Sequence, residues 1–160
     1  MASEDAVAAA RNGRPTLLIW IDAERAVIAR WTGEARLERI ESDVPARHES
    51  TGHVRFDPFV RHGGGGAAQD KIERDREGHL REYLSEVARR VGPGEDVEIL
   101  GPGGVREDLA RAIRLADLEQ RRRRTVVSAP SPRLTDRQLI ARVRERVGAS
   151  APRIHPRRAG

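Results

Sequence analysis

The 160-residue chain contains no cysteine, which excludes disulfide bonds, thiolate metal sites and a thiol nucleophile. A chain without disulfides suits a reducing compartment, so we expect a cytoplasmic protein. Aromatic residues make up only 3% of the chain, which argues against an exposed platform of rings on which nucleic-acid bases stack. No apolar run approaches the roughly 20 residues that a membrane-spanning helix needs. We therefore expect a soluble protein without a membrane partner.

Lysine is also scarce, since Lys71 is the only lysine among 30 basic residues, and the arginines are unevenly distributed. Residues 1–120 hold 18 basic and 23 acidic residues, a net charge of −5. Residues 121–160 hold 12 basic and 2 acidic residues, a net charge of +10. A basic end on an acidic body indicates a polyanionic partner, and RNA is the one we favour. The alternative is a solvated basic tail that only keeps the protein in solution.

The length of the chain suits one domain with its own apolar core. We expect a flexible leader over residues 1–14, a single α/β domain over residues 15–147 and a flexible basic tail over residues 148–160.

Three strands are predicted near the start of this domain. The apolar run 16–22 predicts a strand buried on both faces, and residues 26–32 predict a second strand after a short turn. A more polar stretch around Leu37 and Ile40 completes an antiparallel meander and suits the edge of a sheet.

Helices and strands alternate in the rest of the chain. Helices are predicted over residues 67–91 and 105–120 and after a capping box at Thr135 to Gln138, with strands over 97–100 and 125–129. The apolar stripe of the first helix consists of Ala68, Ile72, Leu80, Tyr83, Leu84, Val87 and Val91. The order β-β-β-α-β-α-β-α predicts a ribonuclease-H-like mixed sheet, an antiparallel meander plus parallel crossover strands, with helices on both faces.

A long connection over residues 46–66 ends in four glycines, from Gly63 to Gly66. Connections of this length are usually functional or disordered. Glycine amides at the start of a helix can bind phosphate, and the neighbouring Arg61 and His62 favour contact with RNA. A plain flexible connector is the alternative. No Lys-Ser or Lys-Thr pair follows the glycines, so this is not a nucleotide-binding P-loop.

Metal-dependent chemistry has weak sequence signals. His48, His53 and His62 match no zinc-ligand spacing, so we expect no metal and no cofactor. A ribonuclease-H-like sheet invites a two-metal nuclease, which needs several carboxylates at one place. Asp22 and Asp96 are the candidates, but Asp22 is more simply interpreted as a turn residue, and a fold does not imply a chemistry.

Four segments in this order resemble the central domain of archaeal and eukaryotic class-1 peptide-chain release factors and of the related rescue factor Pelota. They are the meander LLIWIDAERAVIARWTGEARLERIESDVP, the segment VPARHEST followed by HVRF, the loop and helix RHGGGGAAQDKIERDREGHLREYLSEVA, and the strand and turn VEILGPGGVREDL. The resemblance covers about residues 16–130.

In those release factors a Gly-Gly-Gln motif in the glycine loop promotes hydrolysis of peptidyl-tRNA. Here the glycines are followed by Ala67 and Ala68, and the first glutamine is Gln69, inside the predicted helix. The resemblance therefore implies a module that associates with the ribosome or tRNA but lacks the catalytic glutamine.

We accordingly expect a non-catalytic, ribosome- or RNA-associated translation factor with a hibernation or rescue role. Its partners would be the ribosome, ribosomal RNA or tRNA. The candidate RNA-binding residues are Arg61, His62, Gly63, Gly64, Gly65, Gly66, Arg121, Arg122, Arg123, Arg124, Arg142 and Arg146. Some of these arginines must instead pair with the acidic body.

Two alternatives stay open. One is a peptidyl-tRNA or ester hydrolase that uses the glycine loop with Gln69 as its catalytic residue. The other is a protein–protein interaction module whose acidic body meets a basic partner.

Overall fold

The protein contains a five-stranded mixed sheet with the strand order β3-β2-β1-β4-β5. A computed structural model describes residues 16–45 and 65–148 of the chain. The elements are β1 (Thr16–Ile21), β2 (Arg25–Trp31), β3 (Ala35–Glu41), α2 (Gly65–Arg89), β4 (Asp96–Gly101), α3 (Val105–Glu119), β5 (Val126–Pro130) and α4 (Asp136–Arg146). Strands β1, β2 and β3 pair antiparallel, whereas β1, β4 and β5 pair parallel. The predicted α/β fold, with an antiparallel meander joined to parallel crossover strands, is confirmed.

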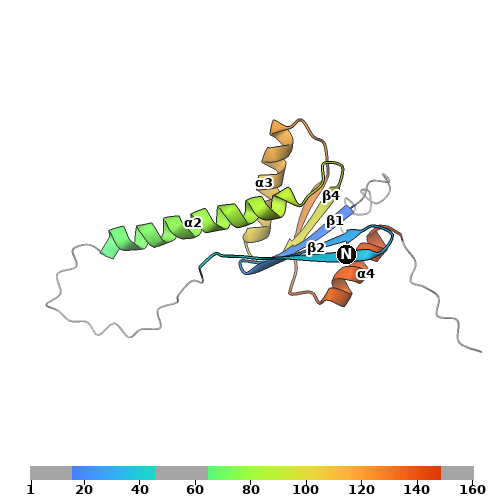
Figure 1. Cartoon of the computed structure of the whole chain (residues 1–160), viewed down its shortest axis with the longest axis horizontal. Coiled ribbons are helices and arrows are strands. Elements are labelled where there is room, and N and C mark those ends of the chain that lie inside the picture. The colour runs from blue at the N-terminus through green and yellow to red at the C-terminus, as the bar shows by residue number, and fades with distance from the viewer. Residues whose placement is uncertain (1–15, 46–64, 149–160) are drawn as a thin grey trace, which may run out of the picture.

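Strand β1 lies at the centre of the sheet and is buried on both faces, as the apolar run predicted. Leu17, Ile19 and Ile21 pack in the same core cluster as residues of α2 and α3. Leu18 and Trp20 point to the opposite face, where α4 covers them. Figure 1 shows α4 on one side of the sheet and α2 and α3 on the other. The meander ends at an edge strand, β3, which was also predicted.

Helix α2 begins and ends two residues earlier than predicted. Gly65 and Gly66 already belong to the helix, because glycine can adopt helical backbone angles at an entropic cost. At the other end the N–H groups of Arg90 and Val91 donate to the carbonyl oxygens of Val87 and Ala88, at 3.1 Å each. These bonds to the third preceding residue tighten the last turn and end the helix.

None of the helices described here is long and apolar enough to cross a membrane.

The turn after β4 depends on Gly101. This residue has a φ of +154°, and a Cβ added to it would lie 1.9 Å from the carbonyl oxygen of Ile21. The backbones of β4 and β1 can approach so closely only because no side chain stands between them. Gly104, in the same turn, has no such neighbour within 4 Å and a φ of −87°.

We predict that Gly101→Ala lowers the free energy of unfolding by about 2–4 kcal/mol, because the methyl group forces β4 and β1 apart. Gly104→Ala is the matched control, with a loss of about 1 kcal/mol or less. Urea denaturation followed by circular dichroism measures both. Equal losses for the two variants would contradict the close approach of the strands.

Candidate nucleic-acid interface

Helix α2 is much longer than the body that it packs against. Its 25 residues span about 37 Å at 1.5 Å per residue. Tyr83, Leu84 and Val87 in its second half are buried in the core. Residues 68–75 are all exposed, and Ile72 of the predicted apolar stripe is 65% exposed. Figure 1 shows the first half of α2 extending well past the sheet. We call residues 65–79 the helical arm.

The arm remains helical without a core to cover. Its side chains alternate in charge, and they interact along the helix. Glu73 and Arg76 form an ion pair at 3.9 Å, and the Nε of Arg74 donates to the carbonyl oxygen of Asp70 at 3.2 Å. Such pairs three and four residues apart each stabilise a helix modestly.

Tyr83 anchors the arm to the sheet. Its ring is only 5% exposed, and its hydroxyl donates to the carbonyl oxygen of Asp22 at 3.2 Å. Burial, followed by the charges of Asp22 and Glu41, raises the pKa of Tyr83 well above its usual value, so the hydroxyl keeps its proton. Asp22 directly follows β1, and the arm therefore extends beyond the carboxyl end of the central strand.

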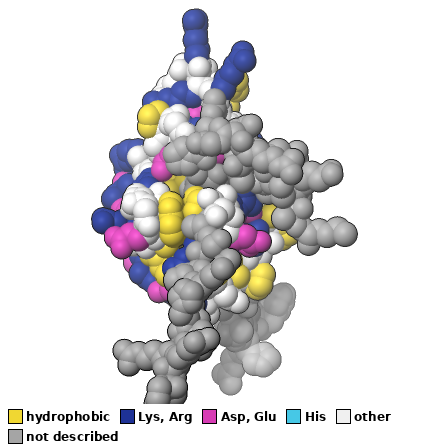
Figure 2. Space-filling model, turned by 90° about the vertical axis from the view of Figure 1, so that its right-hand side faces the viewer, with side chains coloured by type: hydrophobic (Ala, Val, Ile, Leu, Met, Phe, Trp, Pro, Cys, Tyr) yellow, Lys and Arg dark blue, Asp and Glu magenta, His cyan; other side chains and the backbone are white. Residues whose placement is uncertain are grey.

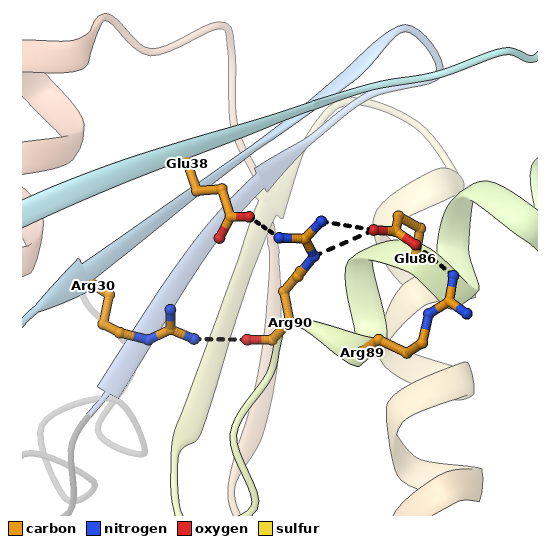
Figure 3. Close-up of polar contacts among 5 residues, drawn as sticks. All are labelled: Arg30, Glu38, Glu86, Arg89 and Arg90. Carbon is orange, nitrogen blue, oxygen red and sulfur yellow. Dashed lines mark hydrogen bonds and ion pairs between the residues drawn. The ribbon is translucent and has the colours of Figure 1, made fainter.

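A cluster of charged residues holds the other end of α2 (Figure 3). The guanidinium of Arg30 on β2 donates to the carbonyl oxygen of Arg90 at 2.6 Å, which satisfies one of the open carbonyls at the helix end. The guanidinium of Arg90 binds Glu86 at 2.8 Å and also Glu38 on β3. We call these four residues, together with Glu95, the clamp.

Glu95 completes the clamp from the turn after α2. Its carboxylate accepts from Nε of Arg30 at 2.7 Å and from the backbone N–H of Gly92 at 2.7 Å. Burial alone would raise the pKa of Glu95. The hydrogen bonds from Arg30 and Gly92, with the charges of Arg30 and Arg124, outweigh burial, and the pKa lies below its usual value. The carboxylate therefore stays ionised and keeps Arg30 in place.

The surface at the base of the arm is acidic. A groove of about 480 Å³ lies between the end of β3 and α2. Glu41, Asp43, Glu82 and Glu86 line it, with His79, Arg81 and Arg89 as its basic residues. An RNA strand would be repelled by this groove, so contact with RNA would have to occur further out on the arm.

The structure describes only some of the residues predicted for the glycine loop. Arg61, His62, Gly63 and Gly64 lie outside the described residues, as do His48 and His53. Gly65 and Gly66 form the first two residues of α2. Gln69 lies within the helix, as predicted, and its side chain is exposed on the arm. Since the chain is continuous, Arg61 to Gly64 are attached to the outer end of the arm.

The four consecutive arginines have different environments. Arg121 and Arg122 are exposed, and within the described part of the chain neither guanidinium has a hydrogen-bond or ion-pair partner. Arg123 is exposed as well. Arg124 is different, because its side chain is only 3% exposed and binds Asp117 at 2.9 Å and the carbonyl oxygen of Gly92 at 2.8 Å. In Figure 2, basic side chains project from the top of the molecule. This height corresponds to the upper end of α3 in Figure 1.

Arg142 and Arg146 share one face of α4, but that face is turned toward the sheet. They bind the carboxylate of Glu98 at 2.8 and 2.5 Å, and Glu98 is only 2% exposed. The hydrogen bond to Glu98 raises the pKa of Arg142, more than burial lowers it. Two cations compensate the buried carboxylate and hold α4 on the sheet. Arg124, Arg142 and Arg146 therefore pair with acidic residues of the body and are not available for RNA.

The carboxylates considered for a nuclease lie apart. Asp22 accepts hydrogen bonds from the backbone N–H groups of Glu24 and Arg25, at 2.8 Å each, so its interpretation as a turn residue is confirmed. Asp96 accepts from the N–H of Thr125 at 2.8 Å and pairs with Thr16 at the start of β1, the opposite end from Asp22. Over residues 16–45 and 65–148, no three His, Asp or Glu side chains are grouped to hold a metal ion.

Sequence reasoning missed the residues that aim the arm. Arg30 and Glu95 are 65 positions apart in the chain, and Tyr83 and Asp22 are 61 apart. No local pattern links them. The single signal was a tyrosine within an apolar stripe, because a buried phenol needs a hydrogen-bond partner.

No protein-family model matches the sequence, and no curated protein is significantly similar to it.

We predict that Glu95→Gln lowers the free energy of unfolding at pH 7 by about 1–3 kcal/mol, because a charged hydrogen-bond acceptor is lost from the clamp. The pKa of Glu95 is lowered by folding, so its contribution is present above the unfolded pKa and is lost as the pH falls through the folded value. The variant should therefore lose less stability than the wild type on acidification from pH 7 to about 3.

Urea denaturation at a series of pH values measures this difference. Glu34→Gln is the control, because Glu34 forms only an exposed pair with Arg36 at 3.2 Å. It should follow the wild-type pH dependence. A wild-type pH dependence in Glu95→Gln would show that the clamp carboxylate does not carry this stability.

Proposed function

We propose that the protein is a non-catalytic, RNA-associated translation factor that acts on the ribosome in hibernation or rescue. The outer end of the helical arm enters an RNA-lined site, and exposed arginines at the other end of the body bind phosphates. The observation that carries this proposal is the arm itself, a helix that is fixed at its base and exposed along its outer half.

The helical arm contributes little to the packing of the body. Residues 65–79 extend for about 22 Å, and residues 68–75 are all exposed. Tyr83 and the clamp nevertheless fix the direction of the helix, through bonds to Asp22, Arg30 and Glu38. A fixed helix of this length suits the delivery of its outer end into a site that the body cannot enter.

The outer end has the composition expected for contact with phosphate. The helix begins with Gly65 and Gly66, and Arg61 and His62 precede it in the chain. Glycine leaves backbone N–H groups accessible, and the start of a helix carries a partial positive charge. Contact with phosphate through backbone N–H groups needs no catalytic side chain. This agrees with the position of Gln69, which is the fifth residue of α2 and not part of the glycine run.

The size of the partner follows from the separation of the two regions. Arg121 and Arg122 precede β5 and lie close to Thr125, at the end of the sheet where β1 and β4 begin. The arm extends from the opposite end, where β1 finishes. The length of β1 and of the arm together place these regions about 40 Å apart. Only an extended polyanion can contact both, which favours a ribosomal particle over a short oligonucleotide. The resemblance to release-factor central domains points to the same partner.

Gly78 allows a test of the arm with two substitutions at one position. It lies in the interior of α2, and a Cβ there would meet no atom within 4 Å. We predict that Gly78→Ala binds ribosomes at least as well as the wild type, because alanine favours the helix. Gly78→Pro should weaken binding about tenfold or more, because proline kinks a helix interior and redirects the arm. Co-sedimentation with ribosomes measures both.

Far-UV circular dichroism should show that the body of Gly78→Pro is still folded. Equal ribosome binding by the two variants, or no binding by the wild type even at low salt, would refute the proposal. The outcome would then favour an interaction module for a protein partner. The same preparations test the hydrolase alternative. Peptidyl-tRNA hydrolysis that Gln69→Ala abolishes would make the protein an enzyme.

We also predict that Arg121→Gln/Arg122→Gln lowers the slope of log affinity against log salt concentration by about 2, because each lost phosphate contact removes about one released counterion. Arg81→Gln/Arg111→Gln removes the same charge from exposed positions elsewhere and should leave the slope unchanged. Ribosome binding at several salt concentrations gives both slopes. The same decrease in both variants would show that only net charge matters.

A further inference from the structure

Among residues 16–45 and 65–148, no strand pairs with the outer edge of β3, which leaves a row of backbone groups without a partner strand. The N–H of Ser42 donates to the carbonyl oxygen of Glu24, and that of Thr32 to the carbonyl oxygen of Glu34. In an antiparallel pair these bonds recur at every second residue, so the even-numbered residues of β3 bond to β2. The N–H and C=O groups of Ala35, Leu37, Arg39 and Glu41 therefore point away from the sheet.

The opposite edge, β5, offers fewer free backbone groups to a partner strand. The N–H of Val97 donates to the carbonyl oxygen of Thr125, so the even-numbered residues of β5 point outward. The outward carbonyl oxygen of Val126 accepts from Arg114 at 3.0 Å. Pro130 has no N–H to offer. Strand β3, by contrast, contains no proline, and no side chain of the described residues binds its outward backbone groups.

We propose that β3 is a self-association surface, on which a second copy of this chain pairs its own β3 in the antiparallel direction. The two sheets then form one continuous sheet, related by a twofold axis through Leu37. Only the outward residues can exchange hydrogen bonds, so Leu37 pairs with the partner's Leu37, and Ala35 pairs with the partner's Arg39.

Among the registers with their axis between Arg36 and Arg39, the charges on β3 favour the axis at Leu37. With the axis at Leu37, Arg36 lies opposite the partner's Glu38, and the twofold axis repeats that ion pair. An axis at Glu38 would place Glu38 opposite the partner's Glu38, and an axis at Arg36 would oppose two arginines. An axis at Arg39 would likewise oppose the two Arg39 side chains. Like charges directly opposite each other destabilise a sheet, whereas opposite charges stabilise it.

The side chains needed for this pairing are accessible. The side chain of Arg36 is 70% exposed, and within the described part of the chain it pairs only with the neighbouring Glu34, at 3.2 Å. The side chain of Glu38 is 38% exposed. Glu38 also binds Arg90 of the clamp, so the carboxylate is held at the edge where the partner's Arg36 would meet it. Leu37 is half-buried against α4 and would be covered further by the partner's Leu37.

The test is sedimentation-velocity ultracentrifugation of the full chain over a range of concentrations. We expect a monomer–dimer equilibrium for the wild type. Arg36→Glu should weaken dimerisation about tenfold or more, because the new carboxylate of each copy would face the carboxylate of the partner's Glu38. Combining Arg36→Glu with Glu38→Arg restores opposite charges across the twofold axis but removes the bond of Glu38 to Arg90. The double variant should therefore recover part of the affinity that Arg36→Glu loses.

Ala35→Pro is the second variant, and it removes an outward N–H without altering any charge or any bond to β2. It should also weaken dimerisation, with an unchanged far-UV spectrum as the sign of an intact fold. A wild type that stays monomeric up to about 1 mM would overturn the proposal. Dimerisation that neither Arg36→Glu nor Ala35→Pro weakens would place the contact on another surface and would also overturn it.

Discussion

The burial of β1 on both faces is the constraint on which the rest of the structure depends. Every residue from Leu17 to Ile21 is at most 3% exposed, so neither face of the central strand can be left to water. Helices α2 and α3 must cover one face and α4 the other. Charged residues make up 34% of the chain and hydrophobic residues only 38%, so most of the large apolar side chains are needed to cover the sheet. Ile72 on the arm is exposed nevertheless, as are Leu115 and Leu118 of α3.

Charged residues join the elements where apolar contacts end. Three acidic residues are buried in the described part of the chain, namely Asp96, Glu98 and Asp117, and each has a specific partner. Glu98 binds two arginines of α4, and Asp117 binds Arg124. A buried carboxylate without such partners would cost several kcal/mol, so these pairs fix which elements can meet. The clamp uses the same chemistry nearer the surface, and it holds the end of α2 on the β2–β3 hairpin (Figure 3).

The sequence predicted the features that are encoded locally. The apolar run of β1, the second strand after a short turn and the capping box of Thr135 and Gln138 were all predicted correctly from a few neighbouring residues. Environments set by distant residues were not predictable in this way. Glu98 alternates with apolar neighbours like an outward-facing residue, but β4 is an inner strand with Arg142 and Arg146 above it.

The run of four arginines shows where the sequence was least informative about burial. Arg121 to Arg124 are indistinguishable in the sequence, yet the side chain of Arg124 is buried, whereas Arg121 and Arg122 are exposed. The difference arises where the chain turns at Arg121, which has a φ of +52°, and then enters β5.

Similarly, the apolar stripe of a helix does not reveal whether another element covers it. Ala68 and Ile72 continue the stripe of α2 although the sheet ends before them. The candidate site therefore became definable only once the length of α2 could be compared with the length of the sheet.

The arm and the clamp also explain each other in physical terms. A helix packed along only half its length acts as a lever, so any force on its free end is multiplied at its base. Apolar contacts of Leu84 and Val87 resist separation from the sheet but allow rotation, because they are not directional. The bonds of Arg30 to the Arg90 carbonyl and of Tyr83 to the Asp22 carbonyl are directional and lie at two separate points of the helix. Two directional bonds at separate points fix an axis, which a helix that served only to cover the sheet would not require.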